Sequence, residues 1–194
     1  MTDVKYDVGM PRSGAAARAR LRAAALELYE RRGYDATTTA QIAEHAGVTE
    51  RTYFRHFADK REVLFDGEVE LRDTMTAAIA VAPPDRAPLD LVMDAYIAAI
   101  PLFVAGRPVA ERRARIMAGS SALQERANTK SAAIAQAVID ALVGRGVPEP
   151  TARLAVRAGA AAFEHASRAW GGTSAAELGR LIAHATEELR GLSA

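Results

Sequence analysis

The sequence predicts an all-α protein of about nine helices, and three observations carry that prediction. Nearly half of the residues are hydrophobic (49%), and many of these are alanine, which has the highest intrinsic helix propensity. Apolar residues recur at helical spacing, and no segment alternates polar and apolar residues as a half-buried strand would. Glycine and proline residues punctuate the helical segments at points typical of short turns. The 194 residues suffice for a small head followed by a larger helical body.

Residues 14–61 predict the head. Apolar residues at i, i+3, i+4 and i+7, counted from Leu21, predict a first helix over about 15–32, and Gly33 is placed to end it. Residues 1–13 precede this helix and are expected to form a disordered arm.

Two further short helices predict a helix-turn-helix. Thr38 and Gln41 form a capping box that starts the second helix. Gly47 permits a tight turn with positive φ, and Thr49 caps a third helix over about 50–57. In such a motif the last helix enters the major groove of DNA while the helix before it lies across the phosphates.

Charge is distributed unevenly along the chain. The formal net charge is +1 overall, but residues 9–61 contain ten basic and six acidic residues and carry +4. A basic head on a more acidic body suits contact with phosphates at one end. A solvated helix face would explain the same charges equally well, so charge alone does not decide.

The stretch 18–64 reads RARLRAAALELYERRGYDATTTAQIAEHAGVTERTYFRHFADKREVL and closely resembles the DNA-binding domain of the TetR family of regulators. The AALELY run, Gly33-Tyr34, the paired threonines, QIAEHAGV, TYFRHF and Lys60 match in one order at fixed spacings. This agreement is far more specific than a bare helix-turn-helix pattern. The resemblance implies a dimeric transcriptional regulator, most simply a repressor that a small-molecule ligand releases from a palindromic operator.

The resemblance also implies roles for individual residues. Arg51 and Thr52 would read base edges. Glu50 would either accept from a cytosine amine or lie solvated in the first helical turn. Thr39 would bond a phosphate. The full predicted DNA-binding set is Thr39, Glu50, Arg51, Thr52, Phe54, Arg55, His56 and Lys60.

Two members of this set and the arm need separate comment. His56 and Lys60 would contact phosphates and fix the register of binding. The family often has tyrosine at the position of Phe54, which cannot form the corresponding phosphate bond, and we expect Phe54 to pack in the core rather than touch a sugar or a thymine methyl. For Arg18 and Arg20, at the start of the first helix, phosphate contact is a further hypothesis.

Residues 62–194 are expected to form a helical regulatory domain for ligand binding and dimerisation. The first expected helix of this domain starts at a cap formed by Asp59 and Glu62 and runs toward Val81. The second covers about 88–105 and is closed by Gly106–Pro108, and the third follows it to about residue 118. The last three cover about 121–143, about 150–170, and the segment that starts at a cap at Ser174.

The last two expected helices predict a dimer surface, because stripes of small and apolar residues allow close helix contact. The alternative is that these stripes face the core of the same chain. The predicted interface residues are Ala158, Ala162, His165, Ala169, Leu178, Leu181, Ile182, Ala185 and Leu189.

The central helices predict an apolar ligand pocket, although each residue taken alone is more typical of plain core packing. The candidates are Met93, Tyr96, Ile100, Phe103, Met117, Phe163, Glu164 and Trp170.

Other functional classes find little support in the sequence. The chain has no cysteine and no histidine pair at metal-ligand spacing, and it lacks the phosphate-binding and nucleophile motifs of common enzymes. We therefore expect no enzyme activity, no cofactor, no metal and no membrane partner, and we expect a cytoplasmic, nucleoid-associated protein. The expected partners are double-stranded operator DNA, a second copy of the chain and a small-molecule effector. An adaptor whose helix-turn-helix binds another protein remains the main alternative.

Overall fold

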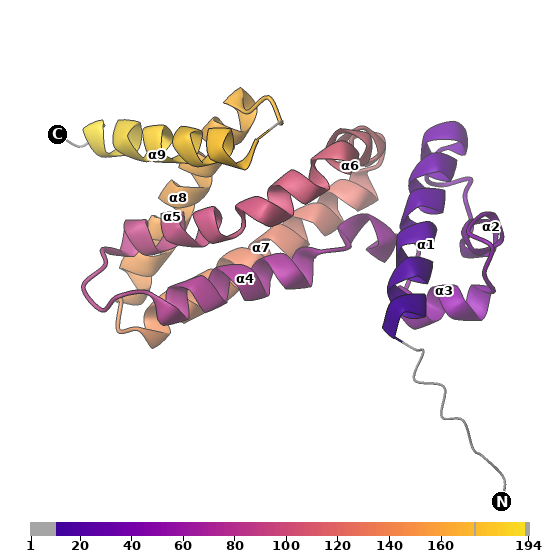
Figure 1. The fold of residues 1–194 in the computed structure, drawn as a ribbon, viewed down its shortest axis with the longest axis horizontal. Coiled ribbons are helices and arrows are strands. Elements are labelled where there is room, and N and C mark those ends of the chain that lie inside the picture. The colour runs from indigo at the N-terminus through magenta and orange to yellow at the C-terminus, as the bar shows by residue number, and fades with distance from the viewer. Residues whose placement is uncertain (1–10, 173, 193–194) are drawn as a thin grey trace, which may run out of the picture. The chain divides into compact units, whose positions relative to one another are not determined.

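The computed structural model describes residues 11–172 and 174–192, and within them it contains nine α-helices, one short 3₁₀ helix and no strand (Figure 1). The predicted all-α class is confirmed. The predicted arm lies mostly in residues 1–10, outside the described residues, and the first helix begins at Pro11. The elements are α1 (Pro11–Arg32), α2 (Thr39–His45), α3 (Glu50–His56), η1 (Glu62–Phe65), α4 (Glu68–Val81), α5 (Pro88–Ala98), α6 (Ile100–Ala118), α7 (Ser121–Gly144), α8 (Glu149–Ala169) and α9 (Ala175–Gly191).

The chain divides into two compact units. The head unit contains the chain up to Asp66 together with Arg112–Gln124, and the body unit contains Gly67–Glu111 and Glu125–Ala194. The boundary predicted after residue 61 is therefore a few residues early. The sequence also gave no sign that the end of α6 and the start of α7 belong with the head.

The core of the head forms where α1 packs against α2 and α3. Leu21 and Ala25 of α1 are fully buried, as are Ile42 of α2 and Tyr53 of α3. These residues recur at helical spacing in the sequence, so burying one face of each helix brings the three helices together. The helix-turn-helix therefore has a fixed base.

The predicted signals for α2 and α3 are confirmed. The Thr38 side chain accepts from the backbone N–H of Gln41, and the Gln41 side chain accepts from the backbone N–H of Thr38. Gly47 has a φ of 66° in the turn between the two helices. The Thr49 side chain accepts from the backbone N–H of Thr52. Local chemistry thus sets both helix starts and the turn.

The start of the fourth helix differs from the prediction. The Asp59 carboxylate accepts from the backbone N–H groups of Arg61 and Glu62, but the turn that it caps is only η1. Gly67 then adopts a φ of 97°, and α4 begins at the next residue. A positive φ at this glycine breaks the helical path that the capping pattern had predicted.

The predicted helix over 88–105 is wrong. The break comes at Ala99, where α5 and α6 bend by 57°, and α6 continues through Gly106 and Pro108. The proline removes one hydrogen-bond donor from α6, yet the helix tolerates it. No single helix in the described residues is long and apolar enough to cross a membrane, and α5 with α6 meets the length and composition only as this bent pair.

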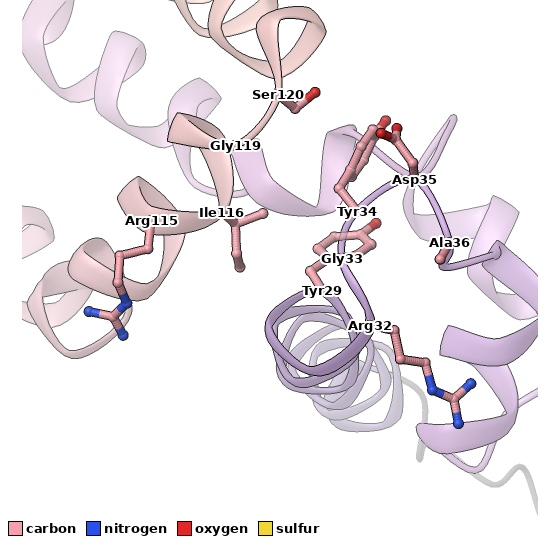
Figure 2. A pocket seen from close by; sticks show the side chains of 10 residues that line it. All are labelled: Tyr29, Arg32, Gly33, Tyr34, Asp35, Ala36, Arg115, Ile116, Gly119 and Ser120. Atoms are coloured by element: carbon pink, nitrogen blue, oxygen red, sulfur yellow. The ribbon is translucent and has the colours of Figure 1, made fainter.

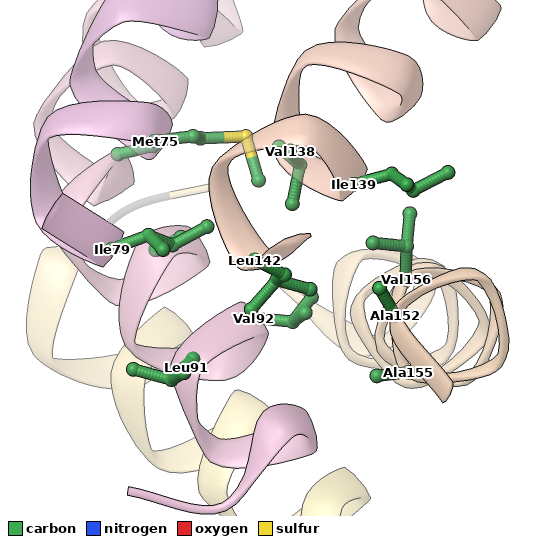
Figure 3. Close-up of a cluster of buried hydrophobic side chains, with 12 residues drawn as sticks. Met75, Ile79, Leu91, Val92, Val138, Ile139, Leu142, Ala152, Ala155 and Val156 are labelled. Atoms are coloured by element: carbon green, nitrogen blue, oxygen red, sulfur yellow. The ribbon is translucent and has the colours of Figure 1, made fainter. Parts of the chain in front are cut away.

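Two hydrophobic clusters hold the body unit together. In the first, side chains from α4, α5, α7 and α8 meet around Leu142 and Val92 (Figure 3). In the second, α5 and α8 enclose Leu178 and Ile182 of α9. Helices α5 and α8 cross closely at Gly159, where an added Cβ atom would lie 2.5 Å from Val92 Cγ1.

Candidate nucleic-acid interface

Two aromatic anchors orient α3. Tyr53 and Phe57 are four residues apart and are both buried against α1 and α2. The Tyr53 hydroxyl donates to the carbonyl of Asp59 at 3.0 Å, and burial raises the pKa of Tyr53 above its usual value. Because these two side chains fix one face of α3 inside the head, the opposite face is presented outward.

The outward face carries most of the predicted base-reading residues. Arg51 and Arg55 are exposed. Thr52 is half-buried, and its hydroxyl lies 3.0 Å from that of Thr49. Phe54 is 52% exposed and touches the ring of Tyr53 edge-on, so our expectation that it packs in the core is wrong. An exposed ring at this point is available to a sugar or a thymine methyl group.

Thr39 and Glu50 lie at the starts of α2 and α3 and bind each other. The Thr39 hydroxyl donates to Glu50 Oε1 at 2.5 Å. The sequence predicts separate contacts with DNA for these two residues and does not predict their pairing. Their pairing places one carboxylate on the surface that carries the arginines.

His56 is turned toward α1. Its Nε2 atom is enclosed without a hydrogen-bond partner, and a Cβ atom added at Gly14 of α1 would lie 4.0 Å from its Cε1 atom. Burial, helped by the nearby charges of Arg55 and Arg18, lowers the pKa of His56 below its usual value. In this arrangement Nε2 cannot reach a phosphate, so the structure gives no support to a phosphate contact through that atom.

Lys60 has an internal role that the sequence did not reveal. Its Nζ atom lies within hydrogen-bond distance of three backbone carbonyls, those of Tyr34 (3.0 Å), Thr37 (3.3 Å) and Asp35 (3.4 Å). It also lies 4.2 Å from the centre of the Tyr34 ring. An ammonium group has three donors, and all three are directed at the turn between α1 and α2. A phosphate contact would require Lys60 to give up one of these carbonyls.

The arginines of α1 bind within the head. Arg18 and Arg22 pair with Asp66 at 2.7 and 3.4 Å, and Arg18 also lies over the ring of Phe57. Arg20 donates to the carbonyl of Ala46 at 3.1 Å. The hypothesis that Arg18 and Arg20 contact phosphates therefore competes with these bonds. Asp66 had no local signal in the sequence that identified it as their partner.

An open groove of about 420 Å³ lies elsewhere on the head unit, between the α1–α2 turn and the end of α6 (Figure 2). Tyr34 and Asp35 line one side, and Ile116 and Ser120 line the other. None of the predicted ligand-binding residues lines this groove.

The predicted ligand-binding residues fall into two groups. Tyr96 and Phe103 both pack on the ring of Phe163, with ring centres 4.3 and 4.6 Å apart. Burial raises the pKa of Tyr96. Met93, Ile100 and Trp170 are buried in the same cluster of the body unit.

The remaining two ligand candidates lie outside that cluster. Glu164 is exposed on α8 and pairs with Arg168. Met117 belongs to the head unit. Neither residue belongs to the buried cluster that holds the other candidates, so both assignments stay predictions without support from that cluster.

Most of the predicted dimer surface is core within one chain. Leu178, Ile182, Ala185 and Ala162 are buried, and Leu181 and Leu189 are partly buried against the same cluster. The alternative that the α9 stripe faces its own chain is the one the structure supports. Only His165 and Ala169 are exposed, and Ala158 is half-buried.

The described residues contain no group of three or more His, Cys, Asp and Glu side chains that could hold a metal ion. Residues 21–66 match the family model described as bacterial regulatory proteins, tetR family. The head is a tetR-family domain.

A curated relative shares part of its sequence with this chain. The HTH-type transcriptional regulator TcmR of Streptomyces glaucescens is 41% identical over 76 residues, which are 39% of this chain. The match spans about a third (34%) of the length of TcmR. The similarity therefore leaves most of both chains uncompared.

Solved structures resemble the whole chain in fold. A putative TetR-family regulator of Mesorhizobium loti has a TM-score of 0.56 at 18% identity, covering 92% of this chain and 97% of that one. TylP, a TetR regulator of Streptomyces fradiae, has a TM-score of 0.55 at 22% identity, and the match covers 90% of this chain and 85% of TylP. At these identities the likeness shows the fold alone, which is all-helical.

Proposed function

We propose that the chain is a sequence-specific DNA-binding transcriptional regulator that acts as a homodimer. The observation that carries this proposal is the outward face of α3 on a tetR-family head. Two buried aromatic residues fix that face, and Arg51, Thr52, Phe54 and Arg55 lie on it. Side chains of these types match base edges and phosphates better than they match a hydrophobic groove on a protein.

The residues of this face divide by the contacts that suit their chemistry. Arg51 lies in the first turn of α3, the part of a recognition helix that reaches base edges, and its guanidinium matches the two acceptors of a guanine. Thr52 follows it in the same turn. Arg55 lies one turn later, where a phosphate contact fixes the position of the helix without reading sequence.

Homodimerisation is supported by the outer face of α8. Leu154, Ala158, Ala161 and His165 recur every three or four residues there, and Leu154 is 69% exposed. Small residues around one large apolar side chain allow a second copy of the helix to approach closely, as a two-fold interface requires. Two heads related by such an axis would bind half-sites about 34–36 Å apart, so the operator is a near-palindrome.

A small-molecule effector is supported by the aromatic cluster of Tyr96, Phe103 and Phe163. Three rings with one hydroxyl group among them suit a largely apolar molecule. The effector lowers operator affinity by preferring a conformation of the body that DNA binding disfavours, and only by as much as its affinity differs between the two states. With such an effector the regulator acts as a repressor that is released on binding.

The test is selection of random duplexes by the purified chain at two salt concentrations, followed by sequencing. We expect a palindromic motif whose affinity falls as salt rises, because phosphate contacts release counterions. The variant Arg51→Ala should lose about 1–3 kcal/mol per head and relax the preference at one position of each half-site. The matched control Arg31→Ala removes an exposed arginine of α1 that pairs with Glu27, and should leave the selected motif unchanged.

Two results would contradict the proposal. A folded, dimeric protein that enriches no motif, with or without candidate effectors, would favour an adaptor whose head binds another protein. A monomer at concentrations that saturate DNA would contradict the two-fold arrangement and the palindrome that follows from it.

A further inference from the structure

The pairing of Thr39 with Glu50 joins the two helices of the helix-turn-helix at the surface assigned to DNA. Thr39 is the first residue of α2, and Glu50 is the first residue of α3. The hydroxyl donates to the carboxylate at 2.5 Å, and the Glu50 side chain is exposed. A hydrogen bond to a carboxylate is short and roughly twice as strong as one between neutral groups.

This bond occupies the group on Thr39 that a phosphate would use. A threonine hydroxyl has a single proton to donate, so it cannot bind Glu50 and a phosphate oxygen through that proton at the same time. Glu50 also brings a negative charge toward any DNA backbone that approaches α2. A carboxylate and a phosphate about 4 Å apart in water repel each other by an energy worth about fivefold in affinity.

We propose that Glu50 determines specificity by exchanging one partner for another. Away from its operator, the carboxylate holds the Thr39 hydroxyl and weakens binding to DNA of any sequence. On the operator, the carboxylate accepts from the N4 amine of a cytosine in the major groove, and the released Thr39 hydroxyl donates to a phosphate. This inference rests on the proposed function and names the base class that Glu50 reads.

The exchange links base recognition to backbone contact. Cytosine presents an amine donor in the major groove, and a carboxylate is its natural acceptor. A duplex without that amine offers nothing to replace the Thr39 hydroxyl, so the phosphate contact is lost together with the base contact. Both contacts are therefore lost on a duplex that lacks this cytosine, and the ratio of specific to non-specific affinity rises.

A purely local role for Glu50 makes a different prediction. As an acid in the first turn of α3, Glu50 would stabilise the helix through its dipole. Its removal would then lower the stability of the head and change all DNA affinities by one factor. The ratio of operator affinity to non-specific DNA affinity therefore separates the two roles. If Glu50 only stabilises α3, its removal leaves that ratio unchanged.

The experiment compares the full chain with Glu50→Gln, Thr39→Val and the control Asp35→Asn. Asp35→Asn removes the same charge from the head at a residue that lines the groove beside α6 and makes no bond to Glu50 or Thr39 in the structure. Each protein is titrated with the selected operator and with a scrambled duplex of equal length, and circular dichroism checks that each is folded.

We expect Glu50→Gln to bind the scrambled duplex about fivefold more tightly per head, or about 25-fold for two heads. Its affinity for the operator should rise less or fall, so that the specificity ratio drops by about tenfold or more. Repeated selection with Glu50→Gln should lose the cytosine at one position of each half-site. Thr39→Val should weaken operator binding more than binding to the scrambled duplex.

The proposal is overturned if Glu50→Gln changes both affinities by the same factor, as Asp35→Asn does, while the wild-type chain still selects a palindrome. It is also overturned if the enriched half-site has no cytosine that depends on Glu50. If the wild-type chain selects no motif at all, the proposed function fails first and this inference fails with it.

Discussion

Lys60 offers the sharpest test of the head, because the sequence and the structure assign it different roles. The change is Lys60→Met, which keeps most of the length of the side chain and removes its charge. In the structure this deletes the donor shared by the carbonyls of Tyr34, Asp35 and Thr37, and the contact with the Tyr34 ring.

The magnitude follows from those contacts. Hydrogen bonds that involve a charged group contribute about 1.5–3 kcal/mol, and an exposed cation–π contact contributes about 0.5–1 kcal/mol. The ammonium group is partly solvated and water reaches the turn, so the sum is not fully realised. We expect Lys60→Met to lower the free energy of unfolding of the head by about 1.5–3 kcal/mol.

The assay is urea unfolding followed by far-ultraviolet circular dichroism, beside operator titration of the same samples. Arg55→Met is the matched control, because it removes an exposed cation from α3. Both variants should weaken operator binding, but only Lys60→Met should shift the unfolding midpoint of the head. Unchanged unfolding of Lys60→Met with weakened binding would refute our reasoning and restore Lys60 as a phosphate contact.

Two further predictions concern stability. Gly159→Ala should destabilise the body by up to about 2 kcal/mol, because the clash with Val92 outweighs the gain in helix propensity. Gly106→Ala has nothing within 4 Å of the added Cβ atom and should stabilise the body by up to about 1 kcal/mol. Equal urea midpoints for the two variants would contradict the close crossing of α5 and α8. Because the pKa of His56 is lowered on folding, the unfolded chain takes up the proton more readily, and stability should fall as the pH drops below the ordinary value of 6.5. Denaturation at pH 5 to 7 should show this slope, and His56→Gln should reduce it; an identical slope in the variant would exclude His56 as its source.

Local chemistry explains which features of the fold were predictable. Thr38, Gln41 and Thr49 bind backbone groups three residues away, so their capping roles can be predicted from the sequence. The spacing of Tyr53 and Phe57 likewise identifies the buried face of α3. These are the features that place the candidate DNA-binding surface.

Partners that are distant in the sequence explain most of the errors. Lys60 binds carbonyls 23 to 26 residues away, and Arg18 pairs with Asp66 48 residues away, and nothing local identifies either set of acceptors. The break at Ala99 is different, because a local signal does mark it: Pro101, the second residue of α6, has no N–H to donate to the carbonyl of Ile97 and is favoured in the first turn of a helix. The apolar stripe of α9 predicts which face of the helix is buried, but it does not predict which helices cover that face.

The membership of α6 in both units bears on how such proteins can be recombined. Within the head unit, the Arg112 guanidinium donates hydrogen bonds of 2.6 to 3.0 Å to the Glu30 carboxylate, and Arg113 donates to the carbonyl of Leu64. A chimaera that receives only residues 1–66 of a relative would set a foreign α1 against the native α6. Transplanting residues 112–124 together with the head would keep those bonds matched. The portable module for changing operator preference is therefore discontinuous in the sequence.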